Sequence, residues 1–168
     1  RLASTVINAL LLITGALALL AILFAEPLVG AFAGDYEHVP GKLGLTVSLT
    51  RTMAPFLTLV AVAAACMGML NSLRHFFIPA LSPATFNIAT VLCAVLLTPV
   101  MSAIGLPPIA SIAIGTLAGG VGQIALQWPA LRAEGYRHRF VLDLRDPGLR
   151  RILLLMGPGT IGLAATQV

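Results

Sequence analysis

The sequence predicts an all-α protein, a polytopic transmembrane helix bundle with about five transmembrane helices. Five apolar stretches contain no Asp, Glu, Lys or Arg, and a helix needs about 20 predominantly apolar residues to cross a bilayer. The composition agrees, because 58% of the residues are hydrophobic and 10% are charged, whereas a soluble domain carries about 25% charged residues. The five stretches cover residues 6–25, 52–70, 78–98, 109–128 and 152–168.

Proline and polar signals bound the first two helices. The first is predicted to end near Glu26-Pro27, where a polar loop follows. Residues 43–49 alternate between apolar and small or polar side chains, which fits a short strand, but a second helix over Leu43–Leu70 is favoured. At 1.5 Å per residue that helix is on the order of 42 Å long, more than the hydrocarbon core requires. Pro55 is predicted to bend it.

Turn residues and prolines also set the remaining helix boundaries. Proline lacks a backbone N–H, so it suits the first turn of a helix and tends to end a helix elsewhere. The last helix is predicted to begin near Leu149. The other predicted boundaries are the turn 71–75, Pro79, Thr98-Pro99, the turn 105–108, Trp128-Pro129 and Asp146-Pro147-Gly148.

The arginines predict the orientation in the membrane, because cytoplasmic loops are enriched in Lys and Arg. One face of the predicted topology carries only Lys42 and Arg51. We therefore expect four transmembrane helices over 1–128, a basic cytoplasmic connector over 129–148, and the start of the next, truncated transmembrane helix over 149–168. The other face carries Arg1, Arg74, Arg132, Arg137, Arg139, Arg145, Arg150 and Arg151.

Several classes of function are disfavoured. The net charge of +4 does not indicate nucleic-acid binding, which needs basic residues clustered on one folded face with stacking aromatics. Cys66 and Cys93 lie in different apolar stretches without a nearby His, so no metal site is predicted. No catalytic grouping is present, and the three His fall in loops. We predict no enzyme activity, no catalytic residue and no cofactor.

Polar residues in or beside the spans are candidates for a substrate path. Arg51 lies at the outer edge of the second span, either as an interfacial anchor or facing an aqueous cavity where it attracts an anion such as phosphate. Arg74 either contacts anionic headgroups or substrate. Uncharged polar residues in spans usually bond neighbouring helices, yet any of them can line a path. The full candidate set is Arg51, Asn71, Arg74, Asn87, Gln123 and Gln167.

Two places are predicted as helix breaks or hinges. One is Pro55, and the other is the run Gly157, Pro158 and Gly159 near the start of the last helix. Transporters place such breaks beside a cavity, although a passive kink is an equal interpretation.

Several motifs occur in a specific order. Residues 51–57 read Arg-Thr-Met-Ala-Pro-Phe-Leu, and 119–123 read Gly-Gly-Val-Gly-Gln. Residues 68–88 contain Asn-Ser-Leu-Arg-His followed by Pro-Ala, a second Pro and Asn-Ile. Residues 127–132, 146–151 and 156–158 complete the pattern. Together these motifs resemble the MurJ/MviN family of lipid II flippases, within the multidrug and oligosaccharidyl-lipid exporter superfamily.

The resemblance implies that the chain is an internal part of a larger transporter of the bacterial cytoplasmic (inner) membrane. It would supply the third to sixth helices and most of the seventh. Implied partners are a lipid-linked pyrophosphate saccharide and membrane lipids, with cell-wall synthesis proteins as further candidates and no nucleic acid. The implied function is flipping of the undecaprenyl-pyrophosphate-linked peptidoglycan precursor to the periplasmic leaflet. The alternatives are a drug/cation antiporter of the same superfamily and a non-transporting scaffold for cell-wall synthesis.

Overall fold

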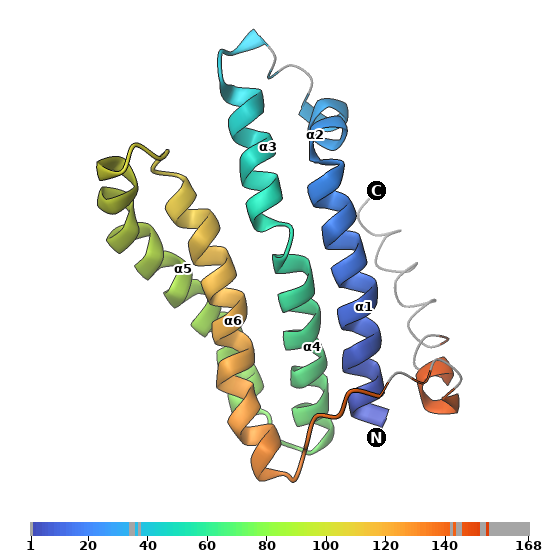
Figure 1. The fold of residues 1–168 in the computed structure, drawn as a ribbon. Helices are drawn as coiled ribbons and strands as arrows, with labels where there is room; N and C mark the ends of the chain where they lie inside the picture. Colours follow the sequence, from blue (N-terminus) through green and yellow to red (C-terminus); the bar gives the residue numbers. More distant parts are fainter. Residues whose placement is uncertain are drawn as a thin grey trace, which may run out of the picture. The chain divides into compact units, whose positions relative to one another are not determined.

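The computed structural model describes residues 2–33, 36, 38–141, 143, 146–151 and 154. Its regular elements are helices, as the sequence predicts (Figure 1). The chain forms two compact units, Arg1–Ala9 with Arg137–Val168, and Leu10–Tyr136. The helices are α1 (Leu2–Leu23), α2 (Ala25–Ala33), α3 (Lys42–Met53), α4 (Phe56–Ser72), α5 (Phe77–Ala103) and α6 (Ala110–Ala133).

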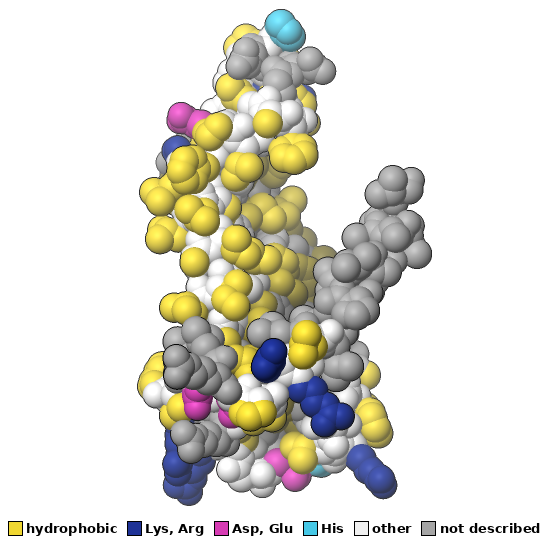
Figure 2. Space-filling model, turned by 90° about the vertical axis from the view of Figure 1, so that its right-hand side faces the viewer, with side chains coloured by type: hydrophobic (Ala, Val, Ile, Leu, Met, Phe, Trp, Pro, Cys, Tyr) yellow, Lys and Arg dark blue, Asp and Glu magenta, His cyan; other side chains and the backbone are white. Residues whose placement is uncertain are grey.

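Among the described residues, four helical segments are long and apolar enough to cross a membrane: Leu2–Leu23, Lys42–Ser72, Phe77–Ala103 and Ala110–Ala133. They correspond to four of the five predicted spans. Most of the fifth, 152–168, lies outside the described residues. Hydrophobic side chains cover much of the helical surface, and charged side chains gather towards the helix ends (Figure 2). Such a surface suits a lipid environment rather than water.

The first span ends earlier than predicted. α1 stops at Leu23 and α2 begins at Ala25, so Glu26-Pro27 lies in the first turn of a second short helix rather than at a helix end. The Pro27 ring meets the carbonyl four residues back, which belongs to Leu23, and cannot donate a bond to it. Proline therefore breaks the helix on its N-terminal side, while suiting the start of the next one.

Pro55 breaks the second span, as predicted. Residues 43–49 are helical, and α3 and α4 together form one span of 31 residues with the break between Met53 and Phe56. At 1.5 Å per residue this span is about 46 Å long, which exceeds the hydrocarbon core of about 30 Å. α2 packs against α3 through Ala25, Val29 and Val47, which are buried together.

Two predicted helix ends are wrong, because α5 continues past Pro99 to Ala103 and α6 continues past Pro129 to Ala133. Membrane helices tolerate internal proline where neighbouring groups satisfy the freed backbone. Both helices end instead where a glycine, Gly105 or Gly135, adopts positive φ. The predicted start of α5 around Pro79 and the turn at 105–108 are confirmed.

Glycines bring α6 close to α5 and α4, which lie beside it (Figure 1). A Cβ on Gly115 would lie 2.9 Å from Cys93 Cβ and 3.0 Å from the Thr90 carbonyl oxygen, both on α5. A Cβ on Gly120 would lie 3.0 Å from Leu59 Cβ on α4. Small residues allow such approach, and membrane helices associate largely through the resulting packing.

In the other unit, the connector runs along the first turns of α1. The Asn8 amide donates to the carbonyls of Arg139 and Val141, each at 2.9 Å, and the Ser4 hydroxyl accepts from the Arg139 N–H at 3.3 Å. Asp146 then caps the next helix, which begins at Pro147, by accepting the Gly148 N–H at 2.7 Å. The helix thus begins at Pro147, slightly before the predicted start near Leu149.

Candidate functional site

The first polar site lies where α2 meets α3. Arg51 Nη2 lies 3.6 Å from Glu26 Oε1, and Arg51 Nε donates to the Ile22 carbonyl at 3.3 Å. Beside this pair is a pocket of about 450 Å³. Arg51 therefore has a nearby carboxylate and a backbone acceptor, and it does not stand as an isolated cation. The pocket is lined by Glu26, Leu43, Gly44, Val47, Ser48, Arg51 and Thr52.

The second polar site is the turn between α4 and α5. The His75 N–H bonds to the Leu70 carbonyl at 2.9 Å, and the Arg74 N–H bonds to the Asn71 carbonyl at 3.0 Å. This pair of bonds forms a Schellman motif, which needs a left-handed residue after the helix. Arg74 takes that place with φ 65°, whereas the ends of α5 and α6 use glycine. An L-residue with a side chain pays about 1–2 kcal/mol for this conformation.

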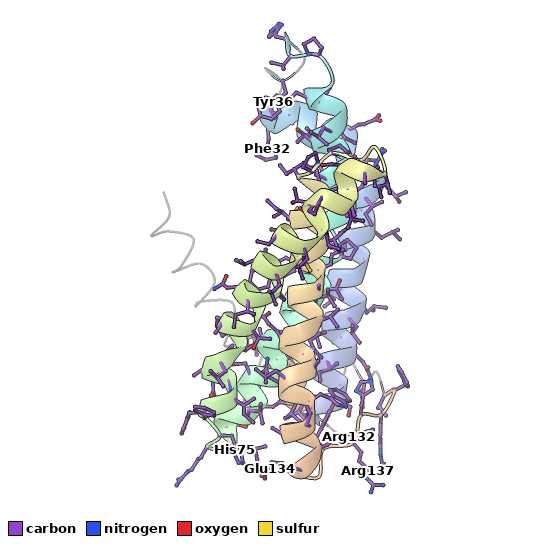
Figure 3. The ribbon with its side chains drawn as sticks, turned by 90° about the vertical axis from the view of Figure 1, so that its left-hand side faces the viewer. Phe32, Tyr36, His75, Arg132, Glu134 and Arg137 are labelled. Carbon is purple, nitrogen blue, oxygen red and sulfur yellow. The ribbon has the colours of Figure 1, made fainter. Side chains whose placement is uncertain are left out.

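A side-chain hydrogen bond joins this turn to the end of α6. His75 Nε2 lies 2.8 Å from Glu134 Oε1, and both residues lie at the same end of the helices (Figure 3). Phe32 and Tyr36 lie at the opposite end. The pair fixes the α4–α5 turn against the residue that follows α6. It is partly exposed, so its contribution to stability is small.

Substitution of Arg74 separates backbone strain from side-chain function. We expect Arg74→Gly to raise the stability of the full-length protein by about 1 kcal/mol, because glycine relieves the left-handed strain. Arg74→Ala keeps the strain and removes the guanidinium, so its unfolding temperature should match that of the wild type. The unfolding temperature of each variant in detergent measures its stability. Equal stability of the Gly and Ala variants would contradict the strain argument.

Gln123 belongs to a buried polar cluster between α5 and α6. Its Nε2 donates to the Ser82 carbonyl at 3.3 Å, and Gln127 Nε2 donates to the Ser82 hydroxyl at 3.0 Å. The two Oε1 atoms are buried with no hydrogen-bond partner among the described residues. Buried amides of this kind join membrane helices. This geometry supports helix packing as the role of Gln123.

The other candidates do not meet in one site. Asn71 is exposed in the last turn of α4, and Asn87 is exposed on α5. Arg51 is separated from that turn by the whole of α4, whose 17 residues extend about 26 Å. The break at Pro55 lies between them. Gln167, Gly157, Pro158 and Gly159 lie outside the described residues.

Two contacts were not anticipated from the sequence. The sequence marks Glu26 only as a residue at the end of the first helix, and nothing in its spacing links it to Arg51. Asn8 and Ser4 carried a usable signal, because residues four apart share one face of a helix and these two are polar in an apolar run. Within the described residues, no group of three or more His, Cys, Asp or Glu is placed to hold a metal ion.

Apolar spans joined by short turns, with polar residues concentrated at the helix ends, define a multi-pass α-helical membrane protein. The whole chain, residues 1–168, matches the family model described as Lipid II flippase MurJ. The chain belongs to the MurJ lipid II flippase family. It is a multi-pass protein of the bacterial inner membrane.

Individual proteins of this family are similar to the chain in sequence. A probable lipid II flippase MurJ of Bdellovibrio bacteriovorus is 34% identical over 168 residues, which cover 99% of this chain and 31% of that protein. A probable lipid II flippase MurJ of Rhizobium meliloti is 34% identical over 163 residues, which cover 95% of this chain and 29% of that protein. The lipid II flippase MurJ of Burkholderia cenocepacia is 30% identical over 128 residues, which cover 74% of this chain and 24% of that protein. The chain thus spans less than a third of these relatives.

Proposed function

We propose that a full-length protein containing this chain moves lipid II, a lipid-linked pyrophosphate saccharide, from the cytoplasmic to the periplasmic leaflet. The observation that carries the proposal is the match of the entire chain to the lipid II flippase family. The helical spans fit it, because they provide walls for a path through the bilayer. The activity is transport, in which helices rearrange by alternating access and no covalent bond is made or broken.

The orientation proposed from the arginines is compatible with the helix ends. Arg74 follows α4 and Arg132 lies in the last turn of α6, at the end that also carries the His75–Glu134 pair. Lys42 begins α3 at the opposite end. We place the Arg74 end and the Arg132–Arg151 connector in the cytoplasm. The proposed division is the four spans over 1–128, the connector over 129–148 and the next helix from 149, although α6 itself runs to Ala133.

The connector is proposed to join this helix group to the rest of the transporter. Its attachment to α1 through Asn8 makes it a fixed link, so movement of α1 and of the following helix would be coupled. Pro55 is proposed as a hinge between α3 and α4, since the break already interrupts the helical hydrogen bonds there. Cell-wall synthesis proteins remain proposed partners, and the proposed substrate-path residues remain Arg51, Asn71, Arg74, Asn87, Gln123 and Gln167.

Depletion of the full-length protein in its bacterial host tests the function. We expect lipid II to accumulate in the cytoplasmic leaflet and to become inaccessible to a membrane-impermeant probe added outside spheroplasts. Re-expression should restore access, whereas a protein lacking residues 1–168 should not. The amount of lipid II is measured separately, so that a defect in synthesis is recognised. Normal outside access during depletion would reject the assignment.

A further inference from the structure

The pocket between α2 and α3 presents charges of both signs beside apolar side chains. It presents one cation, Arg51, and one anion, Glu26, with the hydroxyl residues Ser48 and Thr52 between apolar side chains. Its volume of about 450 Å³ is within the range of small-ligand sites, about 300–1,000 Å³. A ligand with charges of both signs and an apolar portion matches this lining.

The Glu26–Arg51 pair leaves both charges able to bind a ligand. Their separation of 3.6 Å exceeds the roughly 2.7–2.9 Å of a charge-assisted hydrogen bond. The Glu26 side chain is 75% exposed and that of Arg51 is 46% exposed. Because Arg51 Nε is directed to the Ile22 carbonyl, the orientation of the guanidinium is fixed while its terminal N–H groups retain donors.

The pocket lies at the depth of lipid headgroups. Its α3 residues fall within the first eleven residues of a span that is 31 residues long. That span is about 46 Å long, so one end must project beyond a hydrocarbon core of about 30 Å. After Pro55, α4 carries no charged residue and its polar residues are Thr58 near the start and Asn71 and Ser72 at the end. This places the excess length on the α3 side. A phospholipid beside α3 would therefore present its headgroup at the pocket.

We propose that this pocket binds the headgroup of a zwitterionic phospholipid with a primary ammonium, of the phosphatidylethanolamine type. The phosphate lies against Arg51, and the ammonium donates to Glu26. Leu43 and Val47 contact the first methylene groups of the lipid acyl chains. Glu26 disfavours a purely anionic headgroup by repulsion. A quaternary ammonium has no N–H to donate to the carboxylate, so phosphatidylcholine binds less tightly.

Lipid retention by the purified full-length protein tests the site without lipid II. The protein is delipidated in detergent and titrated with phosphatidylethanolamine, phosphatidylcholine or phosphatidylglycerol, with native mass spectrometry and unfolding temperature as readouts. We expect the wild type to prefer phosphatidylethanolamine by about tenfold, the value of one charge-assisted hydrogen bond. Equal retention of the three lipids by the wild type would overturn the proposal, whatever the outcome of the translocation assay.

Variants separate the two charges. Glu26→Gln should abolish the preference for phosphatidylethanolamine over phosphatidylcholine, and Arg51→Gln should weaken retention of both lipids about tenfold. Lys42→Gln is the control, because Lys42 is a cation of the same helix whose ammonium lies 3.7 Å from the centre of the Tyr36 ring and which does not line the pocket. A preference that survives Glu26→Gln, or that is lost equally in Lys42→Gln, would contradict the site.

Discussion

Replacing Gly115 by alanine should destabilise the full-length protein by forcing α5 and α6 apart. The new Cβ would lie 2.9 Å from Cys93 Cβ, 3.0 Å from the Thr90 oxygen and 3.1 Å from Thr90 Cα. Two of these atoms belong to the backbone, so no side-chain rotation relieves the contact and α5 must move away from α6. Overpacking of this kind costs about 1–3 kcal/mol, which thermal unfolding in detergent will show as a lower transition temperature.

The same helix offers a matched control. A Cβ on Gly122 would meet only Thr85 Cγ2 at 3.5 Å, an ordinary contact. Both substitutions gain the same helix propensity of about 1 kcal/mol, so their difference isolates the steric contact. Gly122→Ala should therefore leave stability unchanged or raise it. If the two variants unfold at the same temperature, the close approach of α5 and α6 is not as described.

Replacing Asn8 by alanine should release the connector from α1. The variant loses two hydrogen bonds to the Arg139 and Val141 carbonyls, each contributing about 0.5–1.5 kcal/mol. The released state should become about tenfold more populated or more, since 1.4 kcal/mol is a factor of ten. Trypsin cleaves after arginine, so the rate of cleavage at Arg137 and Arg139 measures how often the connector is released. Cleavage under conditions of rapid opening and closing follows the released population.

Asn87→Ala provides the comparison for this experiment. Asn87 is also an asparagine within a span, but it is exposed on α5 and makes no described contact with the connector. Its tryptic cleavage rate should match that of the wild type in the same detergent. Faster cleavage in both variants would indicate general loosening of the protein, and an unchanged rate in Asn8→Ala would contradict the role assigned to Asn8.

Sequence patterns predicted the features that depend on neighbours along the chain. Apolar run length predicted the spans, and local backbone chemistry predicted the bend at Pro55 and a helix boundary near Asp146-Pro147-Gly148. Proline was less informative at Pro99 and Pro129, where the helices continue. The effect of proline depends on whether other groups satisfy the freed carbonyl, and single-sequence periodicity does not contain that information.

Most contacts between residues far apart in the chain could not be predicted from the sequence. Glu26 and Arg51 are 25 positions apart and meet only because α2 folds against α3 through Ala25, Val29 and Val47. The sequence pattern of Gln123 predicts either a place in a substrate path or a bond between helices, and the fold shows its bond to Ser82 across a helix interface. A lone polar residue in an apolar run has the same pattern in both situations. Only the fold decides which face it occupies.

The bonds of Asn8 also determine how the chain bears mechanical force. They join positions separated by 131 and 133 residues, so the entry to the helical segment and the exit from it are tied together. Tension applied between the start of α1 and the helix that begins at Pro147 would load this amide first. The intervening helices would be bypassed until the tie breaks, and single-molecule pulling would record one short extension before any helix unravels.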